Sequence, residues 1–119
     1  STEQRILNKI ELLNKLRDRG IWLMDTSIMA LYNKGTKPKN KVLDKSLKFS
    51  WEGYTRPLLE EVDPHHIIVI GKRVAANIQN DLKSMDITFN VFEQPGAYLS
   101  TEKHLRNYQN YFRICKANT

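Results

Sequence analysis

One four-residue run constrains the fold of this chain more than any other feature. Residues Ile67–Ile70 are all β-branched, follow Asp63 and Pro64 after a short gap, and end at Gly71. The run has no polar alternation, which is the pattern of a strand covered on both faces and is typical of parallel sheets. We therefore expect this run in the middle of a sheet.

The flanking segments show helical periodicity or further apolar runs. Apolar side chains recur at helical spacing in four long segments and in one short one: residues 2–19, 51–62, 74–82, the segment after Ser100, and 28–31. Ser50 and Ser100 are candidate helix caps, Gly20 is a stop, and Pro57 is expected to kink its helix or delay its start. Residues 21–24 and 87–92 are predicted strands.

This order of elements predicts an α/β fold. We expect a three-layer α/β/α arrangement around a short sheet of three parallel strands. The length of 119 residues fits one domain, residues 1–119. Three strands are few for a sheet of this kind, so the domain is expected to be part of a larger fold.

Composition narrows the class of protein. No apolar run approaches the roughly 20 residues of a membrane helix, and the charged start is not followed by the apolar stretch of a signal peptide. We expect an intracellular protein, cytoplasmic or nuclear, without a membrane partner.

Cys115 is the only cysteine, which excludes an internal disulfide and a cysteine-based zinc site. His65 and His66 lack a third ligand at metal spacing, so we expect no metal and no cofactor.

The positive charge of the chain is concentrated in one segment. The net charge is +6, and residues 33–50 hold six lysines against one acidic residue, Asp44, a local excess of five. The first half of this segment has no helical or strand period, so the segment is expected to be an exposed loop. Lys37, Lys39 and Lys41 are candidate contacts to DNA phosphates. A solvated linker without a partner is the alternative.

The ends of the predicted strands nominate one site. Ligands of open parallel sheets bind beyond the carboxyl ends of the strands, where Asp25, Gly71 and Gln94 would meet. Gly71 and the two basic residues after it also suggest a phosphate-binding turn, but neither common nucleotide-binding glycine motif is present. A tight turn between strand and helix is the alternative interpretation of that segment.

Several separated segments, taken in order, resemble the uracil-DNA glycosylase superfamily. They are residues 19–26, 50–55, 67–72, 94–100 and 104–111. The resemblance implies that Asp25 stands at a base-recognition position and Gln94 at that of the family's catalytic histidine. It also implies that Pro95, Gly96, Tyr98, Leu99 and Ser100 form a DNA-binding loop with an intercalating leucine. The family's first motif would precede Ser1, so the chain is expected to be the C-terminal portion of such a fold.

Two functions follow as hypotheses. The first is a DNA-base glycosylase-like protein, or a C-terminal segment of one, that acts by base flipping. The second is a non-catalytic α/β module that binds nucleic acid or protein. Family members usually carry Asn where this chain has Asp25 and His where it has Gln94. An ionised Asp25 only accepts hydrogen bonds, which suits an amino-bearing base better than uracil.

Overall fold

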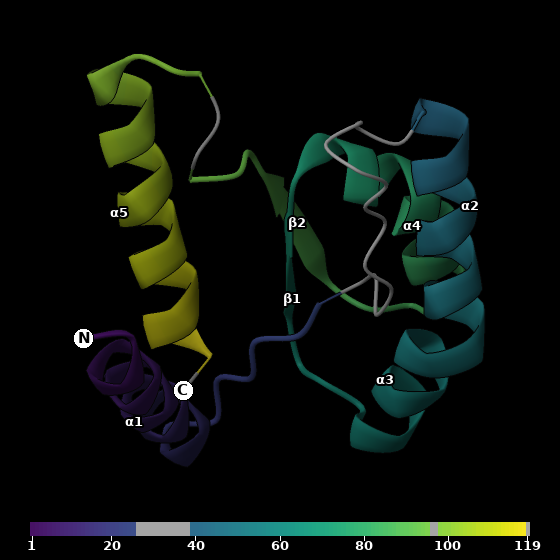
Figure 1. The fold of residues 1–119 in the computed structure, drawn as a ribbon. Coiled ribbons are helices and arrows are strands. Elements are labelled where there is room, and N and C mark those ends of the chain that lie inside the picture. The colour runs from purple at the N-terminus through teal and green to yellow at the C-terminus, as the bar shows by residue number, and fades with distance from the viewer. Residues whose placement is uncertain (26–38, 96–97, 119) are drawn as a thin grey trace.

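The computed structural model describes residues 1–25, 39–95 and 98–118 (Figure 1). In chain order the elements are α1 (Thr2–Asp18), α2 (Asn40–Ser50), a π-helical turn η1 (Trp51–Thr55), α3 (Arg56–Val62), β1 (Ile67–Ile70), α4 (Lys72–Ser84), β2 (Phe89–Phe92) and α5 (Thr101–Ala117). Within these residues, no helix has the length and apolar character needed to cross a membrane.

The sheet consists of β1 and β2, which pair in parallel from Ile67 opposite Phe89 to Ile70 opposite Phe92. The crossover between them is α4, as the sequence predicts. Figure 1 shows α2 and α4 on one side of the sheet and α5 on the other. The chain is thus a small α/β fold with helices on both sides of a parallel sheet.

The prediction of a third strand at residues 21–24 is wrong. Residues 21–25 form neither helix nor strand, and the side chains of Trp22 and Leu23 are 58% and 64% exposed. A strand requires a neighbouring backbone to complete its hydrogen bonds. In the described part of the chain, β1 and β2 pair only with each other, so this apolar run has no ladder to join.

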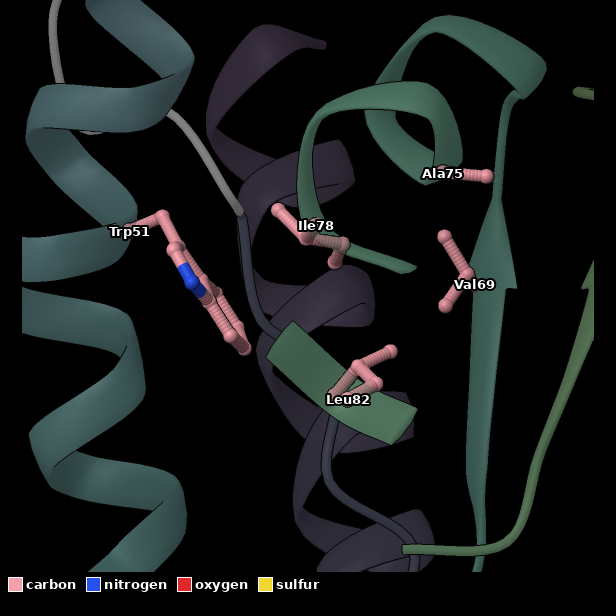
Figure 2. Close-up of a cluster of buried hydrophobic side chains, with 5 residues drawn as sticks. All are labelled: Trp51, Val69, Ala75, Ile78 and Leu82. Atoms are coloured by element: carbon pink, nitrogen blue, oxygen red, sulfur yellow. The ribbon is translucent and has the colours of Figure 1, made fainter. Parts of the chain in front are cut away.

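The core lies between the sheet and the helices α2 to α4. Its buried members are Trp51, Val69, Ala75, Ile78 and Leu82 (Figure 2). Trp51 comes from η1 and extends toward α4, where its indole Nε1 donates a hydrogen bond of 2.7 Å to Asp81 Oδ2. This bond lets a large polar aromatic side chain occupy the centre of the core.

The prediction that the lysine-rich segment is a loop is wrong for its second half. Residues 40–50 form α2, and Ser50 is a buried interior residue rather than a helix cap. Ser46, Leu47 and Ser50 form the buried face, while Lys41, Lys45 and Lys48 lie outside it. The predicted helix at residues 28–31, with Lys34 and Lys37, lies outside the described residues.

Pro57 affects the helix in an unexpected way. The Arg56 N–H donates to the carbonyl of Trp51, five residues back, so the chain forms a π-helical turn before Pro57. A proline ring clashes with the carbonyl four residues earlier and has no N–H to donate. The wider turn relieves this clash and lets helical structure run from Asn40 to Val62. The helix is therefore altered by Pro57 but does not start there.

The terminal helices begin as predicted but contribute little to the core. The Ser100 hydroxyl accepts a hydrogen bond of 3.3 Å from the Lys103 N–H, which confirms Ser100 as the cap of α5. Gly20, with φ of 82°, follows the end of α1, which confirms the predicted stop. Neither α1 nor α5 has a fully buried residue.

Candidate nucleic-acid interface

The carboxyl ends of the two strands lie side by side, as the parallel register requires. The Gly71 N–H, just after β1, donates a hydrogen bond of 2.8 Å to the carbonyl of Phe92 at the end of β2. A Cβ atom at Gly71 would lie 3.1 Å from the side-chain Nε2 of Gln94. The Gln94 amide thus rests directly against the Gly71 backbone, and these two candidate residues are brought together.

A positively charged hollow adjoins this point. It has a volume of about 330 Å³ and is lined by Lys72, Val91, Phe92, Glu93, Lys103, Arg106 and Asn107. Three of these side chains are cationic, and Glu93 is the one carboxylate among them. The hollow is open to solvent, so its charges are available to a large anionic partner.

Glu93 neutralises part of this charge. Its Oε1 lies 2.8 Å from Lys72 Nζ. The Lys72 ammonium, by hydrogen bonding to the carboxylate, lowers the pKa of Glu93 against the opposing effect of desolvation, and the charges of Lys72, Lys103 and His104 lower it further. Glu93 is therefore ionised at neutral pH and offsets the positive charge of Lys72.

Arg106 forms an ion pair with Glu102 at 3.2 Å, and exposed ion pairs of this kind contribute little binding energy.

Tyr111 joins α5 to this end of the sheet. Its hydroxyl donates a hydrogen bond of 3.0 Å to the carbonyl of Glu93, and its ring meets that of Phe92 edge to face at 4.9 Å. Desolvation raises the pKa of Tyr111, so the hydroxyl keeps its proton for this bond. The helical periodicity places Tyr111 on an apolar side of α5, but nothing in it indicates this polar contact.

Three helices begin at the end of the molecule where β1 and β2 finish: α2, α4 and α5 (Figure 1). The N-cap residues of α2 and α4, Lys39 and Gly71, make no side-chain hydrogen bond to the first turn, so no capping side chain offsets the partial positive charge of these helix starts. Asp44 on α2 accepts hydrogen bonds of 3.1 Å from Arg73 and Asn77 on α4 and fixes the two helices together. Both hydrogen bonds lower the pKa of the Asp44 carboxyl, and the bond from Asn77 has the larger effect.

The other candidate residues from the sequence lie as follows. Tyr98 is fully exposed, Pro95 is exposed, Leu99 is half-buried and Ser100 caps α5. Lys39 and Lys41 are exposed at the start of α2. Gly96 and Lys37 lie outside the described residues. Asp25 is exposed, and among the described residues no hydrogen bond or ion pair joins it to Gln94, so their shared site remains a prediction.

The sequence analysis missed Lys103 and Arg106, the two cations that α5 contributes. Both line the hollow beside the end of β2, and their spacing along the helix gave no indication that this side of α5 lies against the sheet. In the described part of the chain, no group of three or more His, Cys, Asp or Glu side chains could hold a metal ion.

Comparisons with protein-family models, with curated proteins and with solved structures give no match to this chain.

Proposed function

We propose that this chain binds DNA through the surface where β1 and β2 end and where α2, α4 and α5 begin, here named the carboxyl-end face. The observation that carries the proposal is the open hollow lined by three cations, Lys72, Lys103 and Arg106, and by one carboxylate, that of Glu93, which pairs with Lys72. Clustered cations that outnumber their acidic partners favour polyanions, because each neutralised phosphate releases condensed counterions. The starts of α2 and α4, which have no capping side chain, add the partial positive charge of a helix N-terminus.

The carboxyl-end face also offers an aromatic side chain for bases. Tyr98 is fully exposed on the segment between β2 and α5, at the position that the glycosylase resemblance assigns to a DNA-contacting loop. An exposed tyrosine next to a phosphate-binding surface suits stacking on an unpaired base. Lys39 and Lys41 extend the face toward α2, and Lys37 belongs to the same lysine-rich segment of the sequence. This arrangement favours a DNA-binding module.

Removal of the three cations is expected to weaken DNA binding and flatten its salt dependence. For the variant Lys72→Ser/Lys103→Ser/Arg106→Ser, the log–log slope of affinity against salt should fall in magnitude by about 2–3 on duplex DNA, since each lost phosphate contact removes about 0.9 from the slope. Fluorescence anisotropy with labelled single-stranded and duplex oligonucleotides measures both quantities. The variant Lys37→Ser/Lys39→Ser/Lys41→Ser tests in the same way whether the start of α2 takes part.

The matched control is Lys9→Ser/Lys15→Ser/Lys83→Ser, which removes the same charge from exposed sites on α1 and at the end of α4. It should leave the slope nearly unchanged. An equal loss in both variants would mean that only net charge matters, and an unchanged slope in the first would remove the carboxyl-end face from the proposal.

Base excision is the activity that the glycosylase resemblance implies, and the position of Gln94 beside Gly71 is the observation that bears on it. We expect no uracil excision by this chain, because hydrolysis needs a group that positions water, and the carboxylate in the hollow is held by Lys72. Incubation with uracil-containing single-stranded DNA, followed by alkaline cleavage of abasic sites, tests this. Strand cleavage above the background without protein would show the prediction to be wrong, and Asp25→Ala and Gln94→Ala would then identify the residue responsible.

A further inference from the structure

A stripe of large side chains on α5 lies open to solvent in the described part of the molecule. Leu105, Tyr108 and Phe112 are 56%, 51% and 68% exposed. Tyr111, whose ring packs on Phe92, lies beside one end of this stripe with its ring 6.4 Å from that of Tyr108, yet all three side chains of the stripe keep more than half of their surface exposed. A contiguous exposed apolar stripe of this kind marks an interaction surface.

The spacing of the stripe is that of a two-helix seam. Residues 101, 105, 108, 112 and 115 alternate steps of four and three, the pattern of inward positions in a coiled coil. Glu102, Gln109 and Lys116 lie seven residues apart along one flank of this stripe. The flank thus carries an acidic residue at its beginning, a neutral one at its middle and a basic one at its end.

This order of charges is complementary to itself in one orientation only. When two such helices run antiparallel, the same flank of each faces the other, so Glu102 meets Lys116 of the second copy and Gln109 meets Gln109. Both ionic pairs form at once because of the two-fold symmetry. In a parallel pair this flank would instead face the opposite flank of the second helix, which carries His104 and Tyr111, so neither Glu102 nor Lys116 would meet an opposite charge. The side chains in the seam would be Tyr108 against Phe112 and Leu105 against Cys115 of the second copy.

We infer that α5 forms an antiparallel pair with α5 of a second copy of this chain, through Leu105, Tyr108, Phe112 and Cys115. The occupant is a second copy because the charges that flank the stripe match those of the same helix reversed. The pairing leaves the inward face of α5, with Tyr111, attached to the sheet.

Phe112→Glu is expected to raise the dissociation constant of the dimer about tenfold or more, since it places unpaired carboxylates in the seam. Sedimentation velocity over a micromolar concentration series measures this. The matched control is Phe49→Glu on α2, where the original side chain is equally exposed at 69%, and it should leave the dimer intact. Circular dichroism checks that both variants remain folded. A chain that stays monomeric at every concentration, or equal losses in both variants, would overturn the inference.

Charge reversal tests the orientation. Lys116→Glu gives a copy with two acidic flank residues, and Glu102→Lys gives a copy with two basic ones. Each variant alone should lose self-association, and an equimolar mixture should form a mixed dimer, because both ionic pairs then join opposite charges. If the mixture behaves as the separate variants do, the antiparallel pairing is wrong.

Disulfide trapping tests the register independently. Cys115 is the only cysteine of the chain, and Leu105→Cys would place a thiol opposite Cys115 of the second copy. Mild oxidation should yield a covalent dimer in which peptide mapping finds position 105 joined to position 115 between chains. Dimers joined only through identical positions would indicate a parallel pair and overturn the inference.

Discussion

Trp51→Ala is expected to lower the free energy of unfolding by about 3–5 kcal/mol, enough to leave much of the chain unfolded. Trp51 is 1% exposed and is the largest member of a core cluster of five buried apolar residues. Its removal opens a cavity between η1 and α4 and also leaves Asp81 without the indole hydrogen bond. Since no second core is present in the described residues, little remains to compensate.

Urea denaturation followed by circular dichroism measures this effect. The matched control is Trp22→Ala, because Trp22 is the other tryptophan and is 58% exposed. This control should change stability by no more than about 0.5 kcal/mol. Trp51→Phe, which keeps a ring but removes the hydrogen bond to Asp81, should fall between the two. A cost for Trp51→Ala no larger than that of Trp22→Ala would show that the core is elsewhere.

Gly71→Ala is expected to destabilise the fold by about 1–3 kcal/mol, through backbone strain. Gly71 has φ of 107° and ψ of 130°, a conformation that residues with a Cβ rarely adopt. The added methyl group would also lie 3.1 Å from Nε2 of Gln94 and push that amide from its place at the carboxyl-end face. DNA affinity is therefore expected to fall together with stability.

Gly53→Ala is the matched control for this substitution. Gly53 lies in η1, has a φ outside the left-handed region, and has no neighbouring atom within 4 Å of the place that a Cβ would take. Alanine at such a helical site should be neutral or stabilise by about 0.4–1 kcal/mol, since it restricts the unfolded chain. Thermal unfolding of both variants gives the comparison. Equal effects at Gly71 and Gly53 would contradict the strain argument.

The parts of the fold that depend on local pattern were predictable. The β-branched run Ile67–Ile70, the periodicity of α4 and the Ser100 cap each have a short-range cause, and each is present in the structure. The meeting of Gly71 and Gln94 also follows from a local rule, because the carboxyl ends of adjacent parallel strands share an edge. The parallel pairing of β1 and β2 is therefore enough to explain why Gly71 and Gln94 lie next to each other.

Features that depend on distant partners were not predictable. Residues 21–24 have the composition of a buried strand, but whether a strand forms depends on a neighbouring backbone that composition does not reveal. The helix α2 was missed for a different reason. Its buried face includes Ser46 and Ser50, which pack closely without adding to an apolar pattern. The cations of α5 entered the candidate site only through the contact of Tyr111 with Glu93.

The π-helical turn affects which side of the long helical segment its buried residues lie on. Leu47, Trp51, Thr55 and Leu59 are four residues apart, and all are buried or half-buried. In a regular α-helix, four residues rotate about 40° more than one full turn. Over the three steps from Leu47 to Leu59, the side chain would therefore move about a third of a turn around the helix. One wider turn at Trp51–Thr55 takes up part of this drift. The buried and half-buried residues from Leu47 to Leu59 can thereby stay on one side of a helical segment that runs without a break from Asn40 to Val62.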